Sequence, residues 1–154
     1  MKEYATDKIR NIAMVSHSGA GKTILADAFL FEKDVINRMG SVTEGNTVSD
    51  FDEEEQRREL SLSTSIIPIE HKDHKINLLD TPGYSDFIGE VLSALRVVEG
   101  ALVIVDAVAG AEVGTETAWN ICDELKLQRL VLINRMKRET ANYGRLGIVE
   151  ARRL

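Results

Sequence analysis

The sequence of 154 residues is long enough to bury one hydrophobic core and short enough that we expect a single domain, residues 1–154. Its 44% hydrophobic and 29% charged residues argue against a disordered or fibrous protein, and its one cysteine, Cys122, excludes an internal disulfide. The net charge of −6 argues against a broad basic face that binds nucleic acid, so we expect no direct nucleic-acid site. No apolar run approaches the ~18 residues that span a bilayer, so we expect a cytoplasmic protein without a membrane segment.

Apolar runs alternate with helix-like stretches along the chain, which favours an α/β sheet. The first run, residues 9–15, predicts a strand that leads into a glycine-containing turn at 16–23. The next residues, 24–31, carry large apolar side chains at a spacing that gives a helix one buried face. The sequence therefore predicts a strand, a turn and a helix in direct succession.

Residues 33–60 interrupt this alternation. The segment holds the turn-forming residues Gly40, Gly45, Asn46 and Ser49, and near its end it carries carboxylates at 52–55 that we expect to be solvated. A loop of this length is uncommon in a compact domain unless it has a function. We therefore expect a long, mobile and functional loop.

Two strands at 63–69 and 75–79 are predicted next, joined by a polar turn that contains His71 and His74. These histidines could ligate a metal, but no further histidine or cysteine is near in sequence, which favours a solvated hairpin turn. The remaining segments predict, in chain order, a helix at 87–98, a buried strand at 101–105, a helix at 115–125 and a strand at 130–133. Residues 138–154 predict at most a short helix.

The strongest functional signal is Gly21-Lys22-Thr23, which lies between the predicted strand and helix. In a phosphate-binding loop, main-chain amides wrap the phosphates at the positive end of the helix dipole. Lys22 would contact the β- and γ-phosphates, and the Thr23 hydroxyl would ligate Mg²⁺. The pattern G-x-x-x-x-G-K-[ST] is kept except at its first glycine, which is Ser16. The expected phosphate-binding residues are Ser18, Gly19, Ala20, Gly21, Lys22 and Thr23.

A magnesium site beside such a loop also needs a carboxylate at the end of a neighbouring strand. Asp80 and Asp106 each close an apolar run, but only Asp80 begins a D-x-x-G sequence, Asp80-Thr81-Pro82-Gly83. In that arrangement the aspartate faces Mg²⁺ and the Gly83 amide can meet the γ-phosphate. We therefore predict Asp80 and Gly83 as site residues, and Asp106 as a strand-ending or capping residue.

With these residues in view, the chain resembles the GTP-binding domain of elongation factor G, a translational GTPase, and especially of the elongation factor G-like paralogues. The similarity runs from about residue 8 to about residue 136 and is carried by residues 18–23, 45–52, 80–84, 95–97 and 134–136. The resemblance implies a P-loop NTPase fold of the α/β class: a three-layer sandwich with a mostly parallel sheet, one antiparallel hairpin strand, and an incomplete C-terminal end.

The resemblance also implies that the domain binds GTP and GDP with Mg²⁺, hydrolyses GTP, and belongs to a full-length protein that binds the ribosome. Residues 33–62 correspond to switch I and residues 80–90 to switch II, which change shape between the triphosphate and diphosphate states. Ser61 aligns with a magnesium-binding threonine of the family, or is an ordinary serine at a strand edge. Asn134 matches the first residue of the guanine-reading N-K-x-D element.

Departures from the family pattern leave other functions open. Tyr84 stands where the family has its catalytic histidine, and a phenol can hydrogen-bond water but cannot take up a positive charge. Catalysis would then rest on Lys22 and Tyr84, and hydrolysis would be slow or differently activated. Lys137 replaces the N-K-x-D aspartate and offers guanine only donors. The alternatives are a nucleoside triphosphatase with a relaxed base preference, and a non-catalytic phosphate-binding fragment.

Overall fold

The computed structural model describes residues 2–49 and 52–141 and contains a five-stranded sheet in the order β2-β3-β1-β4-β5. The strands are β1 (Ile9–Val15), β2 (Ser65–His71), β3 (His74–Asp80), β4 (Gly100–Asp106) and β5 (Gln128–Asn134). The α-helices are α1 (Lys22–Glu32), α2 (Glu53–Arg58), α3 (Ile88–Leu95) and α4 (Val113–Glu124). Short 3₁₀ turns lie at Thr6–Lys8, Val42–Glu44 and Ser85–Phe87.

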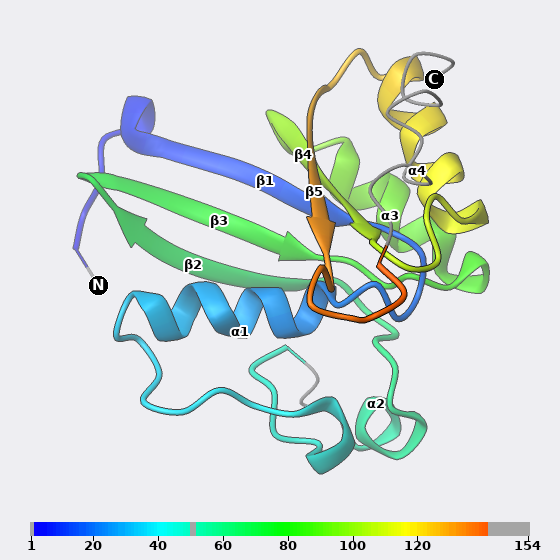
Figure 1. The fold of residues 1–154 in the computed structure, drawn as a ribbon. Coiled ribbons are helices and arrows are strands. Elements are labelled where there is room, and N and C mark those ends of the chain that lie inside the picture. The colour runs from blue at the N-terminus through cyan, green and yellow to red at the C-terminus, as the bar shows by residue number, and fades with distance from the viewer. Residues whose placement is uncertain (1, 50–51, 142–154) are drawn as a thin grey trace.

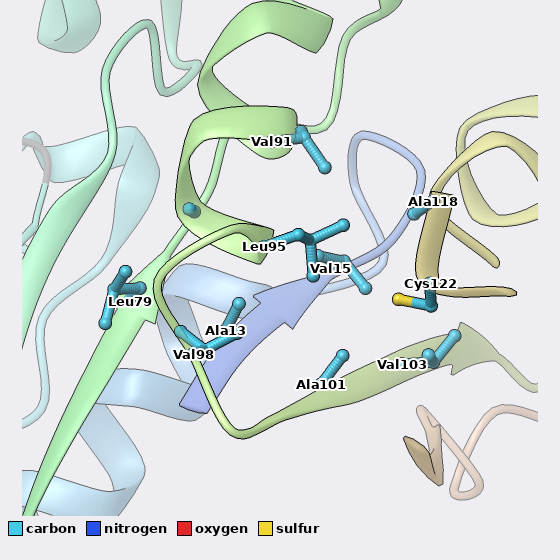
Figure 2. Close-up of a cluster of buried hydrophobic side chains, with 11 residues drawn as sticks. Ala13, Val15, Leu79, Val91, Leu95, Val98, Ala101, Val103, Ala118 and Cys122 are labelled. Carbon is cyan, nitrogen blue, oxygen red and sulfur yellow. The ribbon is translucent and has the colours of Figure 1, made fainter. Parts of the chain in front are cut away.

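Alternating side chains of the strands build two cores, one on each face of the sheet. Figure 1 shows the sheet together with the helices α1, α3 and α4 that pack on it. On one face, Met14 and Leu78 pack with Ala26 and Leu30 of α1. On the other face, the neighbouring strand residues pack against α3 and α4, as Figure 2 shows. The result is the three-layer α/β sandwich that the sequence predicted. The second core consists of Ala13, Val15, Leu79, Val91, Ala94, Leu95, Val98, Ala101, Val103, Ala118 and Cys122.

The sheet is parallel except for the pairing of β2 with β3, as expected. This pair is a hairpin in which His71 pairs with His74 across a two-residue turn. Lys72 and Asp73 in the turn have φ angles of 44° and 60°, the left-handed conformation that matches the twist of a tight hairpin. The prediction of a hairpin turn at these histidines is confirmed.

Parallel strands bring their carboxyl ends to one edge of the sheet. In the register of β1 with β3, Met14 lies opposite Asp80, so the end of β3 is beside the turn that leaves β1. In the register of β4 with β5, Asp106 lies opposite Asn134. Residues from four different strands therefore meet at one edge, near the start of α1 (Figure 1).

The segment at 33–60 is not the uninterrupted loop that we expected, because it contains α2. Asp52 caps this helix by accepting a hydrogen bond from the Glu54 amide at 2.8 Å. Glu54 then pairs with Arg57 and Arg58 one turn later. The expectation of solvated carboxylates is wrong for Glu55, which is 3% exposed and accepts hydrogen bonds from two backbone amides.

The other predicted elements are present with shifted ends. The helix expected at 87–98 begins as the 3₁₀ turn Ser85–Phe87 and continues as α3, which ends at Leu95. The strands expected at 101–105 and 130–133 are each longer, as β4 and β5. The short helix considered within 138–154 and the motif residues at 50–51 fall partly or wholly outside the described residues.

Candidate nucleotide-binding site

The turn between β1 and α1 has the shape of an anion cradle. Gly19 and Gly21 have φ angles of 78° and 96°, a left-handed conformation that costs other residues free energy. Gly21 is the N-cap of α1, so the turn ends at the positive end of this helix. Lys22 follows directly, is 6% exposed, and donates to the Ser16 hydroxyl oxygen at 2.9 Å and the His17 carbonyl at 3.4 Å. The ammonium group is thus held against the turn.

Ser16, the departure from the glycine pattern, fits this turn. It does not adopt a positive φ, so a side chain is tolerated here. Its hydroxyl donates to the His17 carbonyl at 2.8 Å and accepts from the Lys22 ammonium. The substitution therefore adds a polar contact for the lysine and leaves the loop geometry intact.

Gly83 closes the cradle from the side of switch II. A Cβ atom at this position would lie 2.6 Å from the Lys22 Nζ atom and 2.6 Å from the Ser18 amide nitrogen, closer than real Cβ contacts. Only glycine allows this approach. The preceding turn is pinned by Thr81, which is fully buried and donates to the Met14 carbonyl at 2.7 Å. The D-x-x-G segment therefore lies directly against the phosphate loop.

Hydroxyl groups converge on the Asp80 carboxylate, which is 1% exposed. Thr23 Oγ1 donates to Asp80 Oδ2 at 3.0 Å, and Ser61 Oγ lies 3.4 Å from Thr23 Oγ1. Ser49 Oγ donates to the same Asp80 Oδ2 atom at 3.0 Å. Carboxylate and hydroxyl oxygens are the hard donors that Mg²⁺ prefers. This cluster of oxygen atoms around Asp80 therefore fits a magnesium ion.

The strand end that carries Asn134 supports the phosphate loop from behind. Asn134 Nδ2 donates to the Ala20 carbonyl at 2.9 Å, and a Cβ atom on Gly21 would lie 2.6 Å from this nitrogen. The next residue, Arg135, has a φ of 61° and pairs with Asp106 at 2.7 Å. Burial alone would raise the pKa of Asp106, but the Val108 amide and the Arg135 guanidinium lower it below its ordinary value.

A hollow of ≈ 200 Å³ lies at this end of the sheet. Its walls include the phosphate loop, Ser61, Gly83, Tyr84 and Arg135. A larger hollow of ≈ 500 Å³ lies on the α1 face of the sheet, between residues such as Ile12, Phe29 and Leu130. That hollow is mainly apolar and lies away from the phosphate loop. The smaller one is the candidate site, because it lies at the start of a helix and is lined by Lys22 and by the hydroxyl groups of Thr23 and Ser61, which suit a phosphate and its metal.

Residues 7–152 match the model of a family described as the elongation factor Tu GTP binding domain. The chain belongs to this family. Among curated relatives, the chain is 40% identical over 145 residues to the mitochondrial ribosome-releasing factor 2 of Lodderomyces elongisporus. It is 38% identical over 145 residues to elongation factor G of Granulibacter bethesdensis. Each alignment covers 94% of this chain, but only 18% and 21% of the respective relative.

A solved structure from Thermus thermophilus matches with a TM-score of 0.88 at 37% identity, covering 94% of this chain and 22% of that one. The chain is thus a GTP-binding domain of elongation factor G-like type that spans about a fifth of the length of these relatives. Both the fold class and the family predicted from the sequence are confirmed. Among the described residues, no helix has the length and apolarity needed to cross a membrane.

The structure gathers the residues that the sequence nominated for this GTP-binding domain. The hollow is lined by Ser18, Gly19, Gly21, Lys22, Thr23, Ser61, Gly83 and Tyr84. Asp80 accepts a hydrogen bond from Thr23, and Asn134 donates to the carbonyl of Ala20 in the loop. Their roles toward nucleotide and metal stay predictions. Tyr84 is 45% exposed, so its phenol is accessible to water at the rim of the hollow.

Asp106 caps the turn after β4 by accepting a hydrogen bond from the Val108 amide at 2.7 Å, which confirms its predicted capping role.

Two residues of the site region were missed. Asp27 of α1 is fully buried, and its carboxylate accepts from the Gly40 amide at 2.9 Å and the Val48 amide at 3.1 Å. Its position four residues after Thr23, on the same helix face, was a usable signal. The sequence marks Ser49 only as a turn-forming residue, and no local pattern indicates its bond to Asp80.

Proposed function

We propose that this chain binds GDP and GTP with Mg²⁺ and hydrolyses GTP, as the nucleotide switch of a larger, cytoplasmic elongation factor G-like protein that acts on the ribosome. The observation that carries the proposal is the contact of Thr23, directly after Lys22 in the phosphate loop, with Asp80 at the end of β3. The names of the relatives, elongation factor G and ribosome-releasing factor 2, support the ribosomal part.

In this proposal, the amides of residues 18–23 and the Lys22 ammonium bind the β- and γ-phosphates, and the Gly83 amide meets the γ-phosphate. Thr23, Ser61 and Asp80 hold the magnesium ion, directly or through its water shell. When bound, the ion supplies positive charge to the phosphate oxygens. The protein contributes to hydrolysis by positioning and by charge stabilisation, with little covalent chemistry.

Tyr84 is the proposed water-orienting residue. It lines the hollow beside Gly83, where its hydroxyl can hydrogen-bond a water near the γ-phosphate. A phenol cannot become a cation as imidazole does, so we expect slow intrinsic hydrolysis.

A nucleoside triphosphatase with relaxed base preference is the second candidate. Lys137 stands where an acceptor for the guanine N–H groups is expected, and it is exposed in the turn after β5. A donor facing a donor leaves polar groups unpaired, and such mismatches can change discrimination by roughly 10⁴-fold. This observation favours similar affinities for guanine and adenine nucleotides.

The test is a titration with fluorescent GDP, GTP and ATP, with and without Mg²⁺, on the natural chain and on Lys22→Ala. Guanine-selective, magnesium-dependent binding that is lost in the variant supports the leading proposal. Equal binding of guanine and adenine nucleotides supports the second candidate. The absence of binding at millimolar nucleotide would refute both and leave a non-catalytic module.

A further inference from the structure

Ser49 makes a contact at the magnesium site that the proposed function does not use. Its hydroxyl donates to Asp80 Oδ2 at 3.0 Å, the same oxygen that accepts from Thr23 Oγ1 at 3.0 Å. All three side chains are buried, with Ser49 3% exposed. A buried carboxylate group has little freedom to rotate when one of its oxygens accepts hydrogen bonds from two hydroxyl groups.

Ser49 is itself held in place from the other side. Its carbonyl oxygen accepts from the Ser65 hydroxyl at 3.0 Å, and Ser65 lies directly opposite Asp80 in the β2–β3 register. Ser49 therefore bridges the ends of two paired strands, through its hydroxyl to one and its carbonyl to the other. The adjacent Val48 amide donates to Asp27 of α1 at 3.1 Å, which fixes the same stretch of switch I on the helix that begins at Lys22.

We propose that Ser49 is a positioning residue of the magnesium site, which holds the Asp80 carboxylate in the orientation that Mg²⁺ requires and ties switch I to it. The inference rests on the proposed nucleotide and magnesium site. The Thr23 oxygen can offer a lone pair to the metal while its hydroxyl hydrogen stays hydrogen-bonded to Asp80, so both hydroxyl groups can still donate to Asp80 when the metal is bound. Ser49 then acts on the metal through Asp80.

Partners that orient a metal ligand typically change metal affinity by about 10- to 100-fold when they are removed. A residue that merely fills space would instead weaken nucleotide binding to the same extent with and without the metal. The two roles therefore differ in the magnesium dependence of nucleotide affinity, and this difference is measurable without turnover.

The experiment measures fluorescent GDP binding over a range of free Mg²⁺, and in EDTA, for the natural chain, Ser49→Ala, Ser49→Thr and Ser41→Ala. The last variant is the matched control, because the Ser41 hydroxyl lies in the same segment but bonds to Thr43 at 2.8 Å. We expect Ser49→Ala to raise the Mg²⁺ concentration at half-effect by about 10-fold or more, with affinity in EDTA unchanged. Ser49→Thr, which keeps the hydroxyl, should restore the natural value.

An unchanged Mg²⁺ midpoint in Ser49→Ala would overturn the inference, and so would an equal loss of affinity with and without Mg²⁺. If the added methyl group prevents Ser49→Thr from folding, as thermal unfolding would reveal, Asp80→Asn serves instead. In that background Ser49→Ala should shift the midpoint no further, and an undiminished shift would count against the proposal. Failure of the natural chain to bind GDP at any Mg²⁺ concentration refutes the proposed function itself.

Discussion

Replacement of Gly83 by alanine tests whether switch II must touch the phosphate loop for nucleotide to bind. The new Cβ atom would lie 2.6 Å from the Ser18 amide nitrogen and 2.7 Å from its Cα atom. The Lys22 ammonium, also at 2.6 Å, can move away on its flexible stem, but the backbone of Ser18 cannot move without reshaping the cradle. The alanine therefore forces the two segments apart.

Overpacking of this kind costs about 1 to 3 kcal/mol. This strain is relieved by separating the amides that are proposed to bind phosphate. We therefore expect most of this free-energy cost to appear as weaker nucleotide binding, a loss of affinity of about 5- to 150-fold. GTP should lose more than GDP, since the Gly83 amide is proposed to meet the γ-phosphate. The assay is a titration with fluorescent GTP and GDP, together with thermal unfolding to confirm that the variant folds.

Gly89→Ala is the matched control for this variant. Gly89 lies in α3, a few residues further along switch II, and a Cβ atom there would meet nothing within 4 Å. Alanine in a helix is favoured over glycine by about 1 kcal/mol, so this variant should be slightly more stable and bind nucleotide normally. If Gly83→Ala binds GTP as tightly as Gly89→Ala does, the argument from close approach is refuted.

Three further changes test other parts of the site. Asp27→Ala removes the hydrogen-bond acceptor of two amides in switch I and should lower the free energy of unfolding by about 2 to 4 kcal/mol. Glu32→Ala on the same helix is the control and should not lower it, and urea denaturation of both variants measures the difference. Lys137→Asp restores an acceptor for guanine and should raise the ratio of GTP to ATP affinity, and an unchanged ratio contradicts our account of the base site. Because the pKa of Asp106 is lower in the folded protein than its ordinary value of 3.8, the ionised carboxylate stabilises the fold at pH values above 3.8. This contribution disappears as the pH falls through the folded-state pKa. The stability difference between the natural chain and Asp106→Asn should therefore shrink on acidification, and a difference that grows would show the sign to be wrong.

Local patterns predicted the parts of the site whose residues are close in sequence. Gly21-Lys22-Thr23 implies its own structure, because the turn, the helix start and the lysine depend on neighbouring residues. The apolar runs, which alternate with helix-like stretches, likewise predicted which segments form the strands of the sheet. Switch I was harder to predict. The capped helix α2 was overlooked because its charged sequence resembles a solvated loop, although Asp52 followed three residues later by Glu55 is a local signal for the start of a helix.

The sequence by itself therefore determined the α/β class, the phosphate loop and the choice of Asp80 over Asp106, since each follows from local patterns or from a motif, and the three-layer sandwich followed from the family resemblance. Only the tertiary structure decided that Ser49 bonds to Asp80, that Asp27 holds the amides of switch I, and that Gly83 lies against Ser18. Those contacts join segments that are distant along the chain. The residues next to a hydroxyl or carboxylate group in the sequence do not indicate its distant partner. Its role is therefore seen only when folding brings the two groups within hydrogen-bonding distance.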